Sequence, residues 1–293
     1  MKIEKMLRRY RIEDGKKFRL KDHDPADTFD LKSEFKPHAR QQLAHGVEEL
    51  ARLQDILAAQ DRWGLLLIFQ AMDAAGKDGT IKHVMSGVNP QGVQVASFKA
   101  PSGEELSHGF LWRTSKAAPP RGHIGIFNRS YYEEVLVVRV HPEVLEKQKL
   151  PKKLVTKDIW EERFEDINTY ERYLSRNGIG VIKFFLHVSR KEQKRRFLER
   201  LTEPDKNWKF SVADVQERQQ WDEYQDAYED MIRHTAHKHA PWYVVPADNK
   251  WFTRFVVAEA VVKALEEMDL KYPKVSGELQ AELEKARQKL QSE

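Results

Sequence analysis

The chain contains no cysteine, and this absence excludes disulfide bonds and thiolate metal sites. Long apolar runs are also missing. The longest, LLLIF and VLVV, fall far short of the ~18 residues that a membrane-spanning helix needs. The N-terminal stretch MKIEKMLRRYRIEDGKK lacks the apolar centre of a signal peptide. These absences predict a soluble, cytoplasmic protein with no membrane partner.

Neither sign of charge dominates the composition. The chain has 50 Lys and Arg residues against 46 Asp and Glu residues, which gives a net charge of +4. So small an excess does not indicate a nucleic-acid partner. The 293 residues are 40% hydrophobic and 33% charged, which is typical of a folded protein with a sizeable core and a well-solvated surface.

Short runs rich in β-branched or aromatic residues alternate with helical patterns along the chain. Several of these runs are apolar at nearly every position, as strands covered on both faces are. Strands that alternate with helices indicate a parallel α/β sheet. The expected strands are residues 65–69, 93–98, 124–127, 181–188 and 242–245. The polar first 40 residues predict an arm on the surface instead of a further domain.

The stretch AMDAAGKDGTI, residues 71–81, directly follows the first expected strand. A phosphate-binding loop reads G-x-x-x-x-G-K-[ST] between a strand and a helix. Gly76 and Lys77 fit this pattern, whereas Ala71 replaces its first glycine and Asp78 replaces its Ser or Thr. The strand-to-helix context favours a loop that binds phosphate.

Each part of this loop has a physical role in such a site. N–H groups at a helix N-terminus bind anions, and the helix dipole strengthens the attraction. Gly76 lets the backbone approach the ligand, Lys77 supplies a positive charge, and Asp73 is able to hold Mg²⁺ in place of the missing Ser or Thr. The alternative is a tight strand–helix turn, in which Asp73 or Asp78 caps the helix and Lys77 is solvated.

A second polar segment follows the third expected strand, which ends in Asn128-Arg129-Ser130. Ligands of open α/β sheets bind beyond the carboxyl ends of the strands, so Asn128 and Arg129 are expected to face the same crevice as Asp73 and Lys77. Arg129 has the geometry to brace a phosphoryl group with two hydrogen bonds. The alternative is that Ser130 caps a helix while Arg129 forms a surface salt bridge.

A third, basic segment is SRKEQKRRFLERLTEPDKNWKF, residues 189–210. Arg196 and Arg200 stand four residues apart, which places them on one face of a helix, and Lys209 follows. A basic helix just after a strand is where a lid over phosphates is expected. The alternative is a solvated amphipathic helix whose glutamates offset these charges.

Together the three segments resemble the family-2 polyphosphate kinases over roughly residues 35–255. FQAMDAAGKDGTI is similar to the Walker A region of that family, including an acidic third position, and IFNRSYYEEVLVVRV is similar to its Walker B region. The segment after residue 180 and APWYVVPADNKWFTR resemble its lid and C-terminal segments. The resemblance implies a P-loop kinase fold like that of thymidylate kinase, which is a three-layer α/β/α sandwich with a five-stranded parallel sheet and a helical lid.

The resemblance also implies a domain division and a reaction. The kinase domain would span residues 41–270 with a lid at about 189–235, between an arm of residues 1–40 and a helical tail of residues 271–293. Inorganic polyphosphate is the implied phosphate donor, with Mg²⁺ or Mn²⁺ as cofactor, and the implied assembly is a homodimer or homotetramer. Asn128 with Glu133 resembles the class III branch, which uses both AMP and ADP and therefore forms ATP.

Residue roles follow by position in the family motifs. The implied catalytic residues are Asp73, Lys77, Asn128, Arg129, Glu133 and Arg200, with Asp73 and Glu133 as Mg²⁺ ligands. The implied phosphate- and polyphosphate-binding residues are Ala74, Ala75, Gly76, Lys77, Asp78, Gly79, Lys82, Arg196 and Lys209. Asp214 matches an acidic lid residue, although it also closes a capping box that begins at Ser211.

Two other functions fit part of these observations. One is an ATP-dependent nucleotide or nucleoside kinase, which the missing Ser or Thr at Asp78 disfavours. The other is a non-catalytic polyanion- or nucleic-acid-binding protein. The nearly balanced charge and the lack of a basic patch with interleaved aromatic residues weigh against it.

Overall fold

The computed structural model describes residues 3–31, 33–208 and 210–293. Within them, one sheet has the strand order β1-β6-β5-β2-β4-β3. The strands are β1 Arg11–Ile12, β2 Gly64–Gln70, β3 Val93–Ser97, β4 Ile124–Asn128, β5 Ile179–His187 and β6 Trp242–Pro246. The pairs from β3 to β6 are parallel, and β1 lies antiparallel to β6 at one edge.

Helices fill most of the remaining described chain. The α-helices are α1 Ile3–Tyr10, α2 Lys36–Gln60, α3 Lys77–Val84, α4 Trp112–Lys116, α5 Val137–Val140, α6 Pro142–Glu146, α7 Ile159–Arg176, α8 Arg190–Thr202, α9 Pro204–Asn207, α10 Val212–Glu217, α11 Trp221–Thr235, α12 Lys250–Glu266 and α13 Gly277–Gln291. The 3-10 helices are η1 Leu20–Asp22, η2 Ser33–Phe35, η3 Pro90–Gly92, η4 Glu105–Ser107, η5 Tyr131–Val135, η6 Lys152–Leu154 and η7 Arg218–Gln220. None of the helices in these described ranges has the length and apolarity that a bilayer crossing requires.

The expected α/β fold is confirmed, and each of the five expected strands is present within a few residues of its expected bounds. The expected strand number was one too low. The sixth strand, β1, is only two residues long and lies in the segment expected to be an arm. It pairs with the outer edge of β6, so tertiary packing makes it a strand although its own residues show no alternating pattern.

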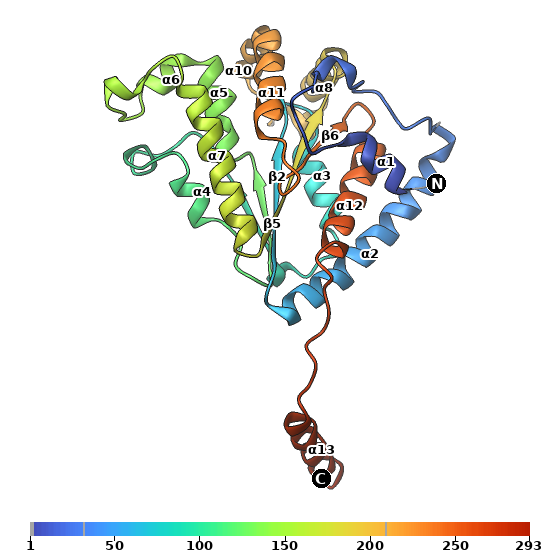
Figure 1. Cartoon of the computed structure of the whole chain (residues 1–293). Coiled ribbons are helices and arrows are strands. Elements are labelled where there is room, and N and C mark those ends of the chain that lie inside the picture. The colour runs from blue at the N-terminus through green and yellow to red at the C-terminus, as the bar shows by residue number, and fades with distance from the viewer. Residues whose placement is uncertain (1–2, 32, 209) are drawn as a thin grey trace.

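Strand β2 lies in the middle of the sheet and shows why three layers form. All seven of its residues are buried. Leu65, Leu67 and Phe69 belong to a core cluster shared with α2, α3 and α12, whereas Leu66 and Ile68 belong to a cluster shared with α7 and α11. Figure 1 shows α2 and α12 on one side of the sheet and α7 on the other.

The N-terminal segment contributes to both faces of this sandwich. Met6, Leu7 and Tyr10 of α1 are buried against the α12 side, with 0%, 4% and 2% of their surface exposed. Phe18 and Leu20 are buried in the cluster on the other side of the sheet. Apolar residues are few in this polar segment, and these five are fully used in packing.

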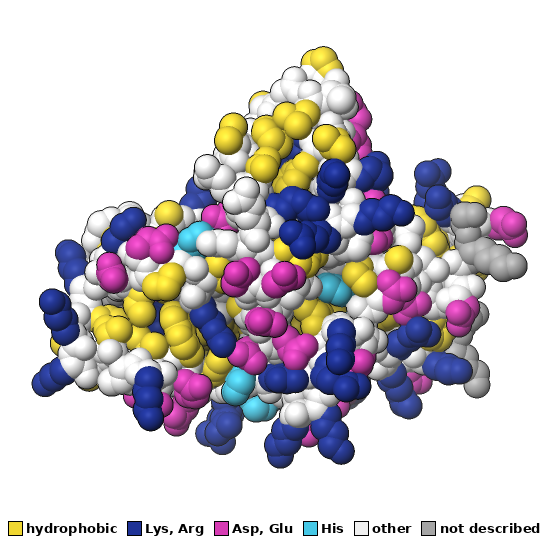
Figure 2. All heavy atoms as spheres, turned by 90° about the horizontal axis from the view of Figure 1, so that it is seen from above, with side chains coloured by type: hydrophobic (Ala, Val, Ile, Leu, Met, Phe, Trp, Pro, Cys, Tyr) yellow, Lys and Arg dark blue, Asp and Glu magenta, His cyan; other side chains and the backbone are white. Residues whose placement is uncertain are grey.

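The sheet topology places the functional loops at one end. β4 and β5 flank β2, and the chain leaves β2 for β3 and β4 on one side and later for β5 and β6 on the other. The carboxyl ends of β2 and β4 are therefore neighbours, as the pairing of Phe69 with Asn128 confirms. Such a switch point is where open α/β sheets bind ligands. Seen from above, acidic and basic side chains gather together in the middle of the molecular surface (Figure 2).

Candidate phosphate-binding site

The loop between β2 and α3 has the backbone shape of an anion site. Ala74 and Gly76 have φ angles of 60° and 100°, which lie in the left-handed region. Glycine adopts this conformation without strain, whereas Ala74 is held in it by its surroundings. Turns with left-handed residues direct successive N–H groups toward a common point, where an anion is bound. Helix α3 then begins at Lys77, so its free N–H groups face the same loop.

Lys77 is a half-buried cation without a direct partner. Its ammonium group makes no hydrogen bond or ion pair with any residue that the structure describes. Burial lowers the pKa of Lys77, and the charge of Arg129 lowers it further, against the opposing effect of Glu133, Asp73 and Asp78. A cation in such a place is stabilised by an incoming anion, which would replace the lost hydration.

The residues after β4 reach the phosphate loop as expected. The Asn128 Nδ2 group donates a hydrogen bond of 2.7 Å to Oδ1 of Asp78, in the first turn of α3. Arg129 has a φ angle of 64°, and its Nη2 atom lies 3.3 Å from Oδ1 of Asp73. Burial alone would lower the pKa of Arg129, but the nearby carboxylates of Glu133 and Asp73 raise it above its ordinary value. Ser130 also caps η5 by accepting from the Tyr132 N–H group. The helix cap expected under the alternative interpretation is therefore present together with the contact between Arg129 and Asp73.

Glu133 is held in place from the end of β2. The buried side chain of Gln70 donates a hydrogen bond of 2.7 Å to Oε1 of Glu133. The Ser130 hydroxyl in turn donates to Oε1 of Gln70 at 3.4 Å. This chain of contacts fixes one carboxylate oxygen of Glu133 and leaves the other for a ligand. The sequence reasoning missed Gln70, although a polar residue that ends an apolar strand is a visible signal.

The predicted lid contributes Arg200 and Asp214 to the same region. Nη1 of Arg200 lies 3.7 Å from Oδ2 of Asp214. Burial, and then the carboxylate of Asp73, raise the pKa of Asp214, while the Ser211 N–H group, hydrogen-bonded to it, acts in the opposite direction. The Ser211 hydroxyl caps α10 by accepting from the Ala213 N–H group, while Asp214 lines the same cavity as Asp73.

One cavity of about 230 Å³ joins part of this site, whereas Lys77, Asn128 and Arg200 are not among its described lining residues. Asp73, Arg129, Glu133 and Asp214 all line it, so four of the residues expected to act together share one space. The other described lining residues are Ala71, Met72, Val137, Gln193, Glu217, Arg218, Tyr224 and Tyr228. A larger hollow of about 640 Å³ lies between residues 101–113 and 148–166, and none of the expected site residues lines it. We place the site in the smaller cavity because charges of both signs converge there.

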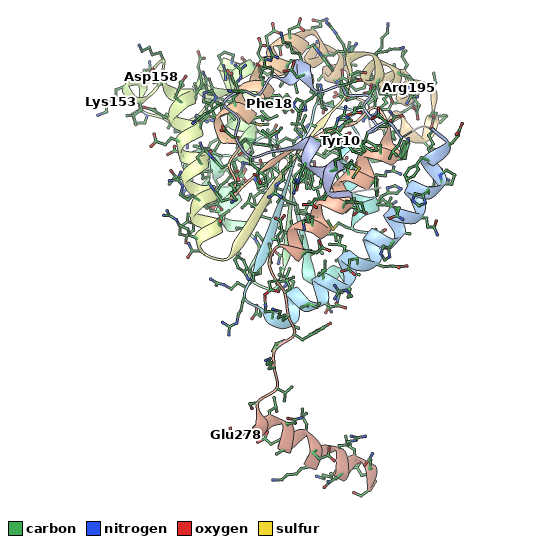
Figure 3. The ribbon with its side chains drawn as sticks, turned by 45° about the vertical axis from the view of Figure 1, so that its right-hand side comes forward. Tyr10, Phe18, Lys153, Asp158, Arg195 and Glu278 are labelled. Atoms are coloured by element: carbon green, nitrogen blue, oxygen red, sulfur yellow. The ribbon has the colours of Figure 1, made fainter. Side chains whose placement is uncertain are left out.

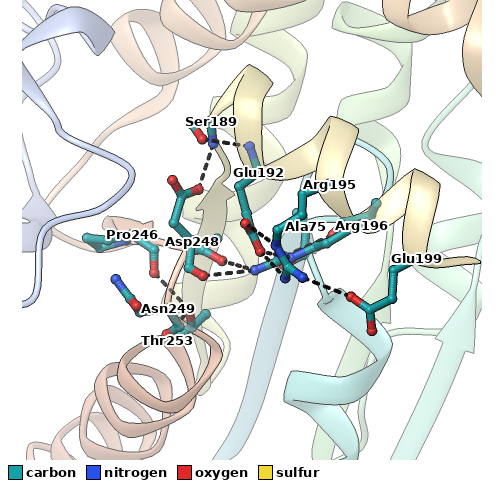
Figure 4. A network of polar contacts seen from close by, with 12 residues as sticks. Ala75, Ser189, Glu192, Arg195, Arg196, Glu199, Pro246, Asp248, Asn249 and Thr253 are labelled. Atoms are coloured by element: carbon teal, nitrogen blue, oxygen red, sulfur yellow. Dashed lines mark hydrogen bonds and ion pairs between the residues drawn. The ribbon is translucent and has the colours of Figure 1, made fainter. Parts of the chain in front are cut away.

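Arg196 has a different task from the expected one. Its side chain is buried, and its Nη1 atom donates to the carbonyl groups of Ala74 and Ala75 at 2.9 and 2.8 Å. Nη2 donates to the carbonyls of Ala247 and Asp248, and Nε donates to Glu192 (Figure 4). All five N–H donors of the guanidinium are used, so the expectation that Arg196 contacts phosphate directly is corrected. It instead ties the phosphate loop to α8 and to the loop before α12.

The remaining expected phosphate ligands are placed as follows. Lys82 is an exposed residue of α3, beyond the first turn of the helix. Lys209 lies outside the described residues. Gly79 lies in the first turn of α3, close to Arg254. A Cβ atom on Gly79 would lie 3.9 Å from Nη2 of that arginine.

Arg254 is a residue that the sequence reasoning missed, although it ends the quoted stretch APWYVVPADNKWFTR. It lies near the start of α12 and is half-buried. Burial lowers the pKa of Arg254, and its guanidinium group makes no hydrogen bond or ion pair within the described ranges. Like Lys77, it is a cation that a bound anion would stabilise.

Known proteins resemble this chain over most of its length. A family model described as polyphosphate kinase 2 matches residues 33–273. An ADP-polyphosphate phosphotransferase from Rhodopseudomonas palustris is 48% identical over 292 residues, with 99% of each chain covered. An AMP/ADP-polyphosphate phosphotransferase from Meiothermus ruber is 43% identical over 267 residues, which cover 91% of this chain and 96% of the relative. The crystal structure of polyphosphate kinase 2 from Arthrobacter aurescens has a TM-score of 0.86 at 39% identity and covers 94% of this chain and 95% of its own.

Proposed function

Because the chain belongs to the polyphosphate kinase 2 family, we propose that it transfers the terminal phosphoryl group of inorganic polyphosphate to AMP and to ADP, forming ADP and ATP. The observation that carries this proposal is the ammonium group of Lys77, which lies at the N-terminus of α3 near Arg129 and has no partner among the described residues. An anionic ligand such as a phosphate group would offset the cost of burying this cation.

The proposed reaction is an in-line transfer between two phosphates. An oxygen of the acceptor phosphate forms a bond to the terminal phosphorus of the donor, and the bond from that phosphorus to the bridging oxygen breaks. Lys77 and the N–H groups of residues 74–79 hold the donor, while Arg129 and Arg200 stabilise the charge on the group in transit. One phosphoanhydride replaces another, so the reaction runs in both directions.

Asp73 and Glu133 are the residues that would hold Mg²⁺. Each keeps a carboxylate oxygen that no described residue contacts, because Arg129 and Gln70 each engage only one oxygen. No group of three or more His, Asp or Glu side chains in the described ranges is arranged as a metal site. Mg²⁺ commonly binds through one or two carboxylates together with substrate phosphates, so this donor set fits it. The bound ion would neutralise charge on the donor and acceptor oxygens.

The polyphosphate chain is proposed to run from Lys77 across the first turn of α3 toward Arg254. Two observations support this direction: the closeness of Arg254 to Gly79, and the lack of any described partner for its guanidinium. Lys82 and Lys209 remain proposed members of the same track. Arg196 supports the track indirectly, because it fixes the carbonyl groups of the loop and so directs the N–H groups outward.

The range of acceptors depends on Asn128 in this proposal. The two relatives described above differ in their names, one as an ADP and the other as an AMP/ADP phosphotransferase. Asn128 donates to Asp78, so an aspartate at position 128 would place two carboxylates within hydrogen-bond distance beside the acceptor phosphate. Their repulsion would disfavour AMP, which needs its own charged phosphate close to them.

The deciding experiment uses the pure full-length protein with AMP, Mg²⁺ and long-chain polyphosphate, without ATP. We expect ADP and then ATP to form, and we expect Asn128→Asp to lose AMP phosphorylation at least tenfold relative to ADP phosphorylation, a difference of about 1.4 kcal/mol. Conversion of ADP alone by the parent protein would remove AMP from the proposal. Phosphorylation that needs ATP as donor would contradict the polyphosphate reaction itself, and binding without turnover would leave only a polyanion-binding protein.

Three further expectations belong to the same proposal. The division into an arm, a body and a tail at residues 40 and 270 remains proposed, as does the lid at about residues 189–235. A homodimer or homotetramer without a nucleic-acid or membrane partner also remains proposed. Function in the cytoplasm is proposed because the chain contains no cysteine for disulfide formation.

A further inference from the structure

Helix α13, Gly277–Gln291, stands apart from the rest of the molecule (Figures 1 and 3). Every residue from 271 to 293 is exposed. Leu279, Leu283 and Leu290 are 46%, 53% and 70% exposed, although leucine usually packs in a core. This helix therefore presents an apolar surface that nothing in the described chain covers.

A helix of this length needs a partner to be stable. Isolated helices shorter than about 12–15 residues are marginal in water, and α13 has 15 residues. Ser276 caps its N-terminus by accepting from the Leu279 N–H group at 3.2 Å, and an ion pair of 4.0 Å joins Glu284 and Arg287. Contacts of this kind stabilise an isolated helix only weakly. The apolar surface is thus the main source of stability still available to the helix.

The spacing of the apolar residues indicates what covers them. Leu279, Leu283, Ala286 and Leu290 follow one another at steps of four, three and four, which is the seam of a two-helix coiled coil. The seam is symmetric about its centre, between residues 284 and 285. In an antiparallel pair of identical helices, Leu279 of one copy meets Leu290 of the other, and Leu283 meets Ala286. Both ends of the seam then form a leucine–leucine layer.

The charges of α13 agree with this antiparallel arrangement. The acidic residues Glu278, Glu282 and Glu284 occupy its first half, and the basic residues Lys285, Arg287 and Lys289 occupy its second half. An antiparallel pair sets each acidic half beside a basic half, whereas a parallel pair sets like halves side by side. The helix dipole alone also favours this distribution, but it does not account for the leucine seam.

We propose that α13 is a self-association helix that packs antiparallel against α13 of a second copy of this chain. Two helices of four turns bury less than the roughly 1,200–2,000 Å² of a standard stable interface. The contact is therefore weak and depends on concentration, or it reinforces an interface between the protein bodies. This inference is independent of the proposed chemistry, because α13 contributes nothing to the site.

A cysteine-pairing experiment tests the arrangement without background, because the chain has no cysteine. Leu279→Cys and Leu290→Cys are made separately in the full-length protein and oxidised mildly, alone and as an equal mixture. We expect disulfide-linked dimers in the mixture and almost none in either variant alone. Efficient linking of each variant with itself would indicate a parallel pair and overturn the proposal, as would the absence of linking in all three samples.

A matched pair of charge substitutions tests whether the seam holds the copies together. Leu283→Glu places a charge in the seam, and Gln288→Glu places the same charge on the opposite face of the helix. Added to the two cysteine variants, Leu283→Glu should reduce the linked fraction at least tenfold at limiting concentration, whereas Gln288→Glu should leave it unchanged. An equal yield in both backgrounds would show that the cysteines meet by collision, and the proposal would fail.

A charge swap then separates the two possible directions. Glu282→Lys and Lys289→Glu should each lower the linked fraction, and a protein with both substitutions should recover it, because these residues face each other only in the antiparallel pair. Kinase activity measured alongside should stay at the parent level in every variant. Failure of the double substitution to recover the linked fraction would contradict the antiparallel register.

Discussion

Two lysines beside the central strand differ in one respect that separates architecture from function. Lys183 lies in β5, next to β2, and is completely buried. Its ammonium group donates to Tyr132, Glu171 and the Thr235 carbonyl at 3.0, 2.6 and 2.7 Å. Lys77 lies just beyond the end of β2 and has no such partner among the described residues. A buried charge with every donor used holds the fold together, whereas a charge left without a partner is available to a substrate.

Burial lowers the pKa of both lysines, but the neighbouring charges act in opposite directions. It lowers the pKa of Lys183, and the adjacent Glu171 opposes that shift. It also lowers the pKa of Lys77, where Arg129 adds to the shift instead. Two arginines differ in the same way as the two lysines. All five N–H donors of Arg196 bind protein acceptors, whereas the guanidinium of Arg254 makes no hydrogen bond to any described residue.

The largest expected effect is on stability, from Lys183→Met. The substitution leaves the buried carboxylate of Glu171 without its counter-ion, and breaking such a pair typically costs about 3–5 kcal/mol of unfolding free energy. Denaturant unfolding measures it, and activity at low temperature should persist because Lys183 does not line the site. The double variant Lys183→Met/Glu171→Gln removes both charges and should recover part of the loss. A double variant no more stable than the single one would contradict the role of the pair.

Lys77→Ala should produce the opposite pattern. Loss of a preorganised charge at a transferring phosphoryl group typically lowers kcat about 10²–10³-fold. The free energy of unfolding should hardly change, since the ammonium group has no partner to lose. Steady-state kinetics with polyphosphate and ADP, together with a thermal melt, check both statements. Full activity in a folded Lys77→Ala protein would remove the loop from the mechanism.

The fold could be predicted from sequence where burial determines composition. Strands covered on both faces are apolar throughout, so five of the six strands were found. β1 was not, because Arg11 and Ile12 carry no pattern and only the free edge of β6 makes them a strand. The meeting of Arg129 with Asp73 was also expected, because the carboxyl ends of parallel strands lie at one end of the sheet.

The task of Arg196 could not be predicted in this way. Helical spacing tells which residues share a face, and it placed Arg196 beside Arg200 correctly. It does not tell which acceptors that face meets, and the carbonyls of Ala74 and Ala247 come from distant parts of the chain. Arg254 was missed for the same reason, since its position is defined by its approach to Gly79 and not by its neighbours in sequence.

Arg196→Lys separates a positioning role from a merely charged one. A lysine keeps the charge but cannot reach four carbonyl groups at once, and each hydrogen bond from a charged donor is worth about 1.5–3 kcal/mol. We expect kcat to fall about ten- to a hundredfold as the loop loosens, with a smaller change in KM for ADP, whose phosphate is held elsewhere.

Arg195→Lys is the matched control for that substitution. Arg195 shares the partner Glu192 but is 58% exposed and does not contact the loop (Figures 3 and 4). Its replacement should leave kcat within about twofold, as exposed ion pairs contribute at most about 1 kcal/mol. Equal losses in the two variants would mean that the fall in kcat does not come from the contacts of Arg196 with the loop carbonyl groups.

Apart from that control, the smallest effect is expected from Arg254→Ala, which tests whether a cation without a described partner outside the catalytic loop binds the substrate. Arg254→Ala should raise KM for long polyphosphate about tenfold, which corresponds to about 1.4 kcal/mol. KM for ADP should stay unchanged, and stability should not fall, because no described contact is lost. The effect should shrink as the donor is shortened, since a chain of only a few phosphates ends before it reaches α12. Uniform loss across all chain lengths would place Arg254 at the reacting end, and no loss at all would show that an unpaired charge in this fold need not serve a ligand.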